Sequence, residues 1–571
     1  MTFKIHRPVI GLLAAGLLAG FGLFVFSEKE DPGFKTTLGP QNEACTVIMV
    51  GKAASTDGST MATHTCDCGV CDWTFGHVPA ADHKPGATRK IYHINQYITW
   101  KEGTKWPYAL SKGDTGFSIP EIPHTFAYHH GMFGYMNENQ VAISESTIGT
   151  VAKLVNATPS ARLDLTTLSL LGMERSRTAR ECVEIMGSLA EKYGYGFNDD
   201  GEMFAVSDPN EIWVFEIIPA GPLWAPETGK PGAVWCAQRV PDDQVSVCPN
   251  ESRIGEVNLA DKDNFLGSAH MISFAVEQKL YDPASGKPFS WKRAYSPAEG
   301  SAVSSGGRRS RLWRLFDLVA PSLKLDPNTP DMDLPFSVKP DKKISVQDVM
   351  NLTRDKSYGS IFDPVSGIRG GPFRNPNYYS GTRKISVANA EYTSLVQCRN
   401  GLPNPIGGIL WVAFGAQDTS CYIPLYAGMT AVPKSFMVGD HYQLNRSSAR
   451  WAFDYVDFHT QVIYNQAIKD VEKARLEYEG AAVQAIPEID KTALELYAKK
   501  PAKAAEYLTK TCLAQADRIV AAWWDLGDRL LVKYDHFGLY DSEKRVRDRG
   551  VQLYDPTWQK AVKMVDTWVE K

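Results

Sequence analysis

Cys45 is the residue whose type and position point most directly to chemistry. It follows 44 residues with the character of export and processing sequence and precedes the β-branched run Thr46 to Val50. As a new N-terminus it would offer both a thiol nucleophile and an α-amine, whose pKa of about 7.7–8.0 suits a base near neutral pH. An amide nitrogen cannot take up that proton. We therefore predict a nucleophile exposed by cleavage after Ala44; the alternative is an ordinary buried cysteine.

The first 44 residues divide into two parts. Residues 1–27 begin with Lys4 and Arg7 and then carry no charge from Pro8 to Phe26, which is typical of a signal peptide or a membrane anchor. This run of 19 residues is long for a signal peptide and just long enough to span a bilayer, so both interpretations stay open. Residues 28–44 are polar and rich in turn formers, which indicates a linker or propeptide.

These features predict that the protein is exported. We expect its body on the periplasmic or extracellular face, with membrane contact only through the N-terminal segment. Whether that segment anchors the protein until processing is left open.

The composition of the remaining 527 residues narrows the function. Their net charge is −4, as for the whole chain, because the first 44 residues contain four basic and four acidic ones. This balance gives no reason to expect a nucleic-acid partner. The length suffices for one large or two moderate domains. The residues indicate no cofactor, and they leave open whether the protein forms a homo-oligomer.

Three of the ten cysteines lie close together, as Cys66, Cys68 and Cys71. Their spacing allows a metal site, but structural zinc usually has four ligands and no matching Cys/His pair follows. In an exported protein, cysteines can instead pair as disulfides. We predict a disulfide or plain buried thiols here, and no metal.

Hydrophobic patterns predict strands near Cys45 and helices near the C-terminus. The first two strands are expected to be joined at an Asp57-Gly58 turn, a strong hairpin signal. The expected elements are strands at 46–50, 60–65, 202–206 and 211–218, one helix at 166–193, and helices after about residue 440.

Motifs spread along the chain resemble those of one known family. They are Cys45-Thr46, Asp57-Gly58-Ser59-Thr60, Asp67, Asn137-Glu138, residues 141–147, 207–213, 239–243, Asn250, 253–256 and 403–428. In these segments the chain resembles the PepD-type dipeptidases. Those enzymes are cysteine N-terminal-nucleophile hydrolases, related to penicillin V acylase and bile salt hydrolase.

This resemblance implies an α+β fold, the αββα sandwich of the N-terminal-nucleophile hydrolases. In that fold two antiparallel sheets stack between helix layers, and the mature N-terminus begins a central strand that directs the nucleophile into the cleft. We expect the hydrolase domain to span residues 45–440 and a helical C-terminal region to span residues 441–571.

The resemblance also implies catalytic residues. Asp67 matches the aspartate that orients the N-terminal amine through a charge-assisted hydrogen bond. Asn250 matches an asparagine that supports the oxyanion or the amine. Arg311 resembles a distal active-site arginine, and the neighbouring Arg308, Arg309 and Arg314 leave that choice open.

Three further residues are expected to line the cleft. His64 falls where many relatives carry arginine, so a full positive charge is not expected there, because histidine is only partly protonated at neutral pH. It could contact the thiol or the substrate, or serve packing. Glu145 and Ser146 fall where relatives place cleft-lining residues, and the Glu145 carboxylate could hold the free amine of a dipeptide.

Taken together, these features predict an exported cysteine peptidase that hydrolyses dipeptides or short peptides after self-processing. The same fold also supports amidases or acylases that cleave other amides, because pocket shape sets the substrate. A third interpretation is a non-enzymatic, membrane-tethered protein with a metal or redox site at its clustered cysteines.

Overall fold

The computed structural model describes residues 45–94, 111–155, 160–196, 200–297, 308–379, 381–541, 545–549 and 553–566. These residues belong to one compact unit, Asn42–Lys571. The expected signal or anchor and the linker lie outside the described residues. In the described ranges, every helix is too short or too polar to cross a bilayer.

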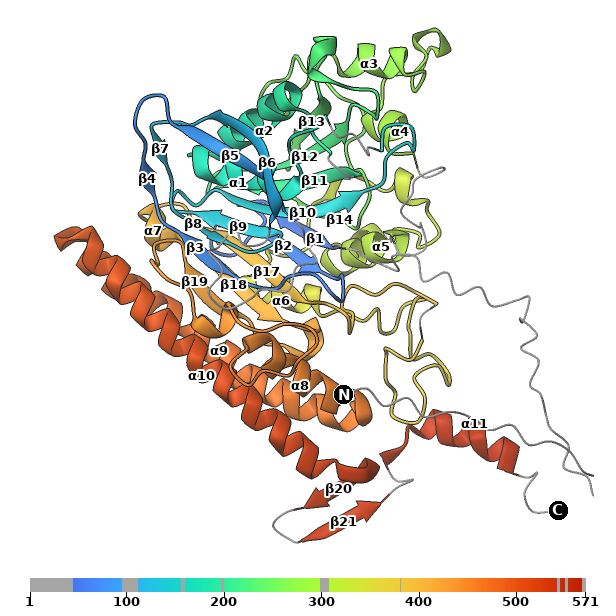
Figure 1. Cartoon of the computed structure of the whole chain (residues 1–571). Helices are drawn as coiled ribbons and strands as arrows, with labels where there is room; N and C mark the ends of the chain where they lie inside the picture. The colour runs from blue at the N-terminus through green and yellow to red at the C-terminus, as the bar shows by residue number, and fades with distance from the viewer. Residues whose placement is uncertain are drawn as a thin grey trace, which may run out of the picture. The chain divides into compact units, whose positions relative to one another are not determined.

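Two antiparallel sheets form the centre of this unit (Figure 1). The seven-stranded sheet consists, in spatial order, of β16 (Ser337–Val338), β14 (Val245–Cys248), β1 (Val47–Val50), β2 (Thr60–Cys66), β17 (Tyr392–Cys398), β18 (Gly408–Phe414) and β19 (Ile423–Tyr426). The eight-stranded sheet consists of β15 (Phe265–Gly267), β13 (Ala233–Arg239), β12 (Ile212–Pro219), β11 (Gly201–Ser207), β10 (Ala142–Ile148), β9 (Gly134–Asn137), β8 (Tyr128–His130) and β3 (Gly76–Val78).

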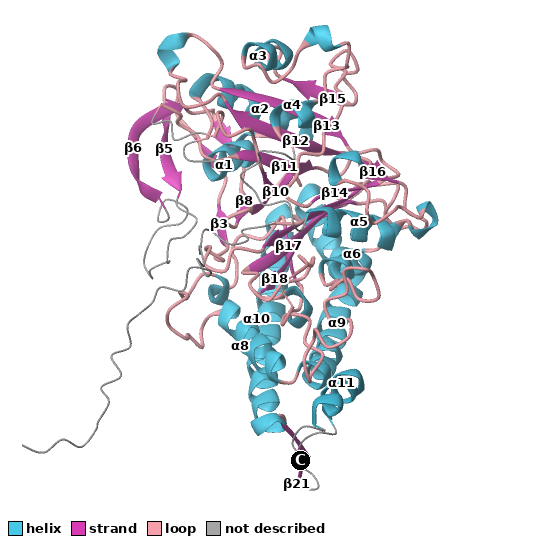
Figure 2. Ribbon diagram, turned by 90° about the vertical axis from the view of Figure 1, so that its right-hand side faces the viewer, coloured by secondary structure: helices cyan, strands magenta, loops and turns pink. Residues whose placement is uncertain are grey.

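The two sheets stack face to face between layers of helices (Figures 1 and 2). Strand β2 contacts β10 and β11 of the other sheet. Helices α1 (Leu165–Arg175) and α2 (Ala179–Tyr193) pack on the eight-stranded sheet around a separate apolar cluster. Helices α8 (Ala449–Val462), α9 (Tyr464–Lys499) and α10 (Pro501–Lys533) pack on the seven-stranded sheet at β18 and β19. The expected αββα sandwich is therefore confirmed.

The remaining elements connect or extend these layers. Among them, α5 matters most for the site because it packs against β14, the neighbour of β1. The remaining helices are α3 (Met271–Glu277), α4 (Trp291–Tyr295), α5 (Arg308–Val319), α6 (Val346–Thr353), α7 (Asn404–Gly407) and α11 (Pro556–Asp566). The remaining strands form three pairs, which are β4 (Ala81–Asp82) with β7 (His124–Thr125), β5 (Thr88–Ile94) with β6 (Ser111–Pro120), and β20 (Gly538–Asp541) with β21 (Val546–Arg549).

The predicted hairpin after Cys45 is confirmed as the antiparallel pair β1–β2. In its connection, the carboxylate of Asp57 accepts hydrogen bonds from the backbone N–H of Ser59 at 3.1 Å and from its hydroxyl at 2.6 Å. Gly58 adopts a φ of 77°, which a residue without a Cβ reaches without strain. The strand pair predicted at 202–206 and 211–218 is also confirmed, as β11 and β12.

The prediction of one helix over 166–193 is wrong, because two helices occupy this segment. Helix α1 ends at Arg175, and Ser176 has extended backbone angles. Thr178 then begins α2 by accepting a hydrogen bond from the N–H of Glu181 at 3.2 Å. A Thr-x-x-Glu sequence is a signature of a helix start, so this break had a local signal.

Candidate active site

Strand register places Cys45 in the interior of the seven-stranded sheet. The residue precedes β1 by two positions, and β1 lies between β14 and β2. Val47 pairs with Cys248 in antiparallel register, so continuing the register by two residues brings Cys45 opposite Asn250. The predicted nucleophile and the predicted oxyanion residue are thus neighbours on adjacent chain segments.

Arg311 holds the backbone at Cys45. Its Nη1 donates to the carbonyl oxygen of Cys45 at 2.5 Å and to the hydroxyl of Thr46 at 2.9 Å. Its Nη2 donates to the carbonyl oxygen of Pro249 at 2.8 Å and to Oδ1 of Asn250 at 3.1 Å. One buried guanidinium therefore joins the segment before β1 to the segment after β14.

The structure also separates Arg311 from the arginines beside it. Arg314 donates to both carboxylate oxygens of Asp355 at 3.0 Å. The side chains of Arg308 and Arg309 lie outside what the structure describes. Burial lowers the pKa of Arg311 to about 9, which still leaves the guanidinium charged at neutral pH.

Asp67 is linked to the same peptide group through the hydroxyl of Thr65. The hydroxyl of Thr65 accepts a hydrogen bond from the N–H of Thr46 at 2.8 Å and donates to Oδ2 of Asp67 at 2.8 Å. The peptide group between Cys45 and Thr46 is therefore fixed at its nitrogen by Thr65 and at its carbonyl by Arg311. Orientation of a free Cys45 amine by Asp67 stays a prediction, because the network shown reaches Thr46.

Two residues that sequence reasoning missed hold the Asp67 carboxylate. Arg383 Nη2 donates to Oδ2 at 2.5 Å, and Gln417 Nε2 donates to Oδ1 at 2.9 Å. They lie 316 and 350 residues further along the chain, where no local pattern marks them. Thr65 was missed as well, although its place two residues before Asp67 was a usable signal.

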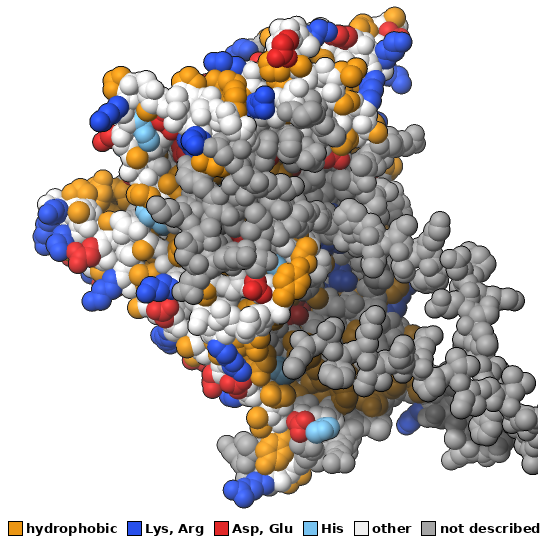
Figure 3. Space-filling model, viewed as in Figure 1, with side chains coloured by type: hydrophobic (Ala, Val, Ile, Leu, Met, Phe, Trp, Pro, Cys, Tyr) orange, Lys and Arg blue, Asp and Glu red, His pale blue; other side chains and the backbone are white. Residues whose placement is uncertain are grey.

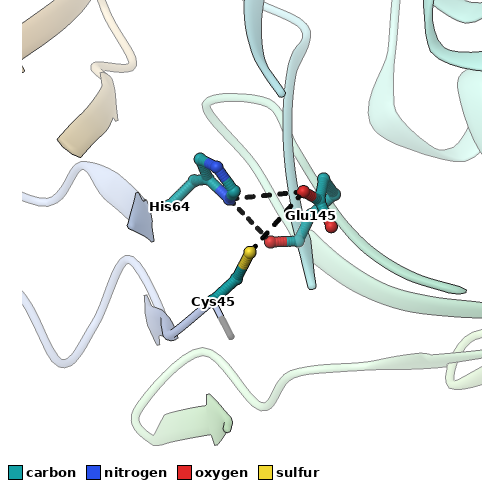
Figure 4. Close-up of side chains that lie close together, drawn as sticks. All are labelled: Cys45, His64 and Glu145. Atoms are coloured by element: carbon teal, nitrogen blue, oxygen red, sulfur yellow. Dashed lines mark hydrogen bonds and ion pairs between the residues drawn. The ribbon is translucent and has the colours of Figure 1, made fainter. Parts of the chain in front are cut away.

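Glu145 and His64 lie beside the thiol, one from each sheet (Figure 4). The Cys45 Sγ lies 3.8 Å from Glu145 Oε1, and His64 Nδ1 lies 3.8 Å from the same oxygen. His64 Nδ1 also lies 2.8 Å from the carbonyl oxygen of Glu145, which only accepts hydrogen bonds, so Nδ1 carries a proton in this contact. Donor atoms of the three residues lie within 4.8 Å of one another, so this set could hold a metal ion.

The surroundings of Cys45 disfavour its thiolate. Burial, with the negative charges of Glu145 and Asp67, raises the pKa of the thiol well above its usual range. In the uncut chain the nitrogen of Cys45 is an amide, which cannot accept the thiol proton. The uncut chain therefore holds a neutral thiol, which is a poor nucleophile.

Asn250 and Ser146 support one another at the edge of this site. The backbone N–H of Asn250 donates to the Ser146 hydroxyl at 3.2 Å, and its side-chain Nδ2 donates to the carbonyl oxygen of Thr147 at 2.9 Å. Asn250 also has a φ of 64°, an unusual angle for a non-glycine residue. Among the described residues Nδ2 makes this one hydrogen bond, and a contact of its second N–H with an oxyanion stays a prediction, as does substrate contact by the buried Ser146.

The clustered cysteines form a disulfide rather than a three-thiol site. Cys68 and Cys71 are bonded to each other, whereas Cys66 is buried and takes no part in this disulfide. Two of the three sulfurs are therefore not available as thiolate ligands.

The sequence comparisons identify the family of the chain. The profile of Peptidase family C69 matches residues 44–477. A probable dipeptidase of Salmonella dublin is 28% identical over 392 residues, which cover 68% of this chain and 81% of that protein. Dipeptidase A of Lactobacillus helveticus is 25% identical over 416 residues, covering 70% and 79%. The chain belongs to peptidase family C69, and the resemblance seen in its sequence is confirmed.

Membership of this family makes the chain a peptidase, so the interpretation as a non-enzymatic binding protein is wrong. Among solved structures, penicillin V acylase from Agrobacterium tumefaciens is similar with a TM-score of 0.27 and 9% identity, covering 67% of this chain and 86% of the acylase. That similarity is too low to support an argument. The sandwich assignment rests on the strand order and packing described above.

Proposed function

We propose that this protein is an exported cysteine dipeptidase whose nucleophile, Cys45, becomes the N-terminus when the chain is cut after Ala44. The observation that carries the proposal is the fixed peptide group at Cys45, held by Arg311 and Thr65 with the thiol beside Glu145. The start of the family match at residue 44, one residue before Cys45, supports it.

Cleavage supplies the base that the uncut chain lacks. The new α-amine lies on the same residue as the thiol and can accept its proton. The resulting ammonium also offsets the negative charges of Glu145 and Asp67, which raise the thiol pKa in the uncut chain. The cut therefore converts a protonated thiol into a thiolate without moving another residue.

The reaction then follows from the positions of the donors. The Cys45 sulfur attacks the peptide carbonyl, and the free N–H of the Asn250 amide can donate to the oxyanion that forms. The Cys45 ammonium gives its proton to the leaving amine as the C–N bond breaks, which leaves an acyl group on sulfur. A water molecule, deprotonated by the same amine, releases the acid and restores the thiol.

Dipeptides are the substrates we propose, because the relatives bear that name and the site holds a carboxylate suited to a free ammonium. Glu145 Oε2 is buried and has no hydrogen-bond partner among the described residues. A substrate ammonium would supply both the hydrogen bond and the charge that this oxygen lacks. Such a contact favours substrates whose free amine lies one residue from the scissile bond.

Two observations support the proposal that the protein is exported. The uncharged run from Pro8 to Phe26 after a basic start is typical of a secretion signal or anchor. The Cys68–Cys71 disulfide fits an oxidising compartment, where such bonds persist.

N-terminal sequencing and intact mass of the purified protein test this proposal directly. We expect the active protein to begin at Cys45. Cys45→Ala should retain the segment before residue 45 and lose at least about a thousandfold of dipeptide turnover, because it lacks the nucleophile for both reactions. Cys66→Ala removes a nearby buried thiol and should be cut and active.

Fully active protein with Cys45 still internal would contradict the mechanism. A substrate panel tests the specificity: dipeptides should be cleaved, and N-acetylated dipeptides should be cleaved far more slowly because they cannot bind Glu145 as ammonium ions. Preferential cleavage of acylated amines would instead identify an amidase on the same fold.

A further inference from the structure

Three different metal-binding groups meet at the nucleophile. A thiol, an imidazole and a carboxylate come from Cys45, His64 and Glu145, and their donor atoms lie within 4.8 Å of one another (Figure 4). His64 and Glu145 are almost fully buried, and Cys45 taken as a whole residue is half-buried.

The spacing is close to that of a tetrahedral zinc site. Zinc–sulfur and zinc–nitrogen bonds of about 2.3 Å and 2.0 Å place neighbouring ligands roughly 3.3–3.5 Å apart. The sulfur and His64 Nδ1 each lie 3.8 Å from Glu145 Oε1. All three donor atoms lie within 4.8 Å of one another, so movements of no more than roughly 1 Å would bring them to zinc-ligand spacing.

The charges at the site also favour a cation. Glu145 is 2% exposed, and its Oε2 has no hydrogen-bond partner among the described residues. Among the described residues, the ion-pair partner of Glu145 is His64, whose Nδ1 lies 3.8 Å from Glu145 Oε1. A divalent ion would place a full opposite charge at bonding distance from this buried carboxylate, which reduces the cost of burying it.

The ligand types select among metals. Calcium and magnesium prefer six or more oxygen ligands, which this site does not offer. Thiolate with imidazole suits zinc and related transition ions, and zinc accepts a carboxylate as well. If the chain is cut as proposed above, the Cys45 amine becomes a fourth ligand that forms a five-membered chelate with its own sulfur.

We propose that Cys45, His64 and Glu145 bind Zn²⁺ and that the bound ion holds the peptidase reversibly inactive. The inactivation rests on the proposed function of Cys45 as nucleophile; the metal site does not. On binding, the thiol releases its proton to solvent, and the imidazole proton shifts from Nδ1 to Nε2. Sulfur stays reduced, so chelation of the zinc returns the free thiol.

Cobalt binding tests the site without relying on turnover. Titration of the protein purified after expression of the full-length chain should show one equivalent of Co²⁺ bound. The bound cobalt should give a near-ultraviolet thiolate-to-cobalt band, which disappears when Zn²⁺ displaces the cobalt. Cys45→Ala should lose the band, whereas Cys66→Ala should keep it. His64→Asn and Glu145→Gln should each weaken Zn²⁺ binding by at least about tenfold, the loss that even an outer-shell partner causes.

Several results would overturn the site: no thiolate band, a band that persists in Cys45→Ala, or unchanged affinity in both His64→Asn and Glu145→Gln. Comparable thermal unfolding midpoints for these two conservative variants guard against misfolding as the cause of lost binding. Dipeptide cleavage should stop at one equivalent of Zn²⁺ and return on addition of EDTA. Full cleavage with zinc bound would refute the inactivation, and a cobalt-binding protein that never cleaves dipeptides would refute only the proposed function.

Discussion

At the residue scale, the central feature is a single peptide group with both of its polar atoms held. Arg311 donates to the carbonyl of Cys45, and Thr65 accepts from the N–H of Thr46. The orientation of this peptide group sets the direction of the Cys45 side chain and of the Cys45 nitrogen, which is the amine in the proposed cleaved form. Small displacements of reacting groups lower the reaction rate strongly, since a shift of about 1 Å can reduce it about a hundredfold.

Thr65→Val tests this positioning. Valine keeps the shape of threonine and removes the oxygen that joins Thr46 to Asp67. We expect kcat to fall by about 10–100-fold with little change in KM, because the nucleophile is misplaced while the substrate contacts remain. Steady-state kinetics on a dipeptide, with intact mass to confirm cleavage before Cys45, measures the effect.

Thr63→Val is the matched control. Thr63 makes the same kind of contact on the same strand, accepting from the N–H of Ile48 at 2.9 Å, but two residues further from Cys45. This variant should lose similar stability and keep its kcat. Equal losses of kcat in the two variants would show that the contact serves the strand pair rather than the nucleophile.

At the element scale, the helix layers depend on close contacts with the sheets. Helix α2 packs on β11, β12 and β13, and its Gly187 lies against the indole of Trp235 in β13. A Cβ added at Gly187 would overlap that ring. Gly187 therefore allows α2 to approach the eight-stranded sheet closely, although glycine has a lower helix propensity than alanine.

Gly187→Ala should destabilise the protein. Alanine favours the helix, but the overlap with Trp235 should outweigh that gain and give a net loss of about 1–3 kcal/mol. The control is Gly480→Ala in α9, where a Cβ would meet no atom within 4 Å. That change should stabilise by roughly 0.5–1 kcal/mol. Chemical denaturation measures both, and a stabilised Gly187→Ala would contradict the close contact.

At the scale of the whole molecule, a buried polar chain links the C-terminal helices to the active site. Glu479 of α9 accepts two hydrogen bonds from Arg354, at 2.9 Å and 2.5 Å. Arg354 Nε also donates to the carbonyl oxygen of Gln417 at 3.2 Å, and Gln417 in turn holds Asp67. The helices after residue 440 therefore contribute to the support of the site as well as covering the sheet.

Glu479→Gln tests this link. The change leaves the Arg354 guanidinium buried without its counter-charge, which typically costs about 3–5 kcal/mol. We expect that loss in chemical denaturation, together with a lower kcat because Gln417 loses a fixed neighbour. Glu488→Gln is the control, since Glu488 is exposed beside Lys491 and should change stability by less than about 0.5 kcal/mol. A Glu479→Gln protein as stable as this control would refute the link.

One face of the molecule carries charges of both signs. On the face shown in Figure 3, acidic and basic side chains of the described residues are interspersed. Such a mixture of signs on this face gives little long-range steering of a charged molecule.

The sequence alone determined the features that depend on local patterns. The β-branched run after Cys45 and the Asp57-Gly58 turn predict the β1–β2 hairpin because alternation and turn formers act over a few residues. The break between α1 and α2 was equally local, marked by Thr178 and Glu181, and was overlooked. Cys45 was predicted as the nucleophile because that hypothesis depends on its own residue type and on the character of the sequence before it.

The family resemblance named Glu145 and Arg311 as site residues, but only the tertiary structure showed which atoms contact Cys45. Glu145 comes from the opposite sheet, 100 residues away, and Arg383 and Gln417 lie more than 300 residues beyond Asp67. Strand register and sheet stacking create these contacts, and no periodicity within one segment encodes them. The same packing raises the pKa of the Cys45 thiol through burial and adjacent carboxylates. Residue type thus singled out Cys45 as the candidate nucleophile, and the fold decided which groups surround its thiol and the direction in which they shift its pKa.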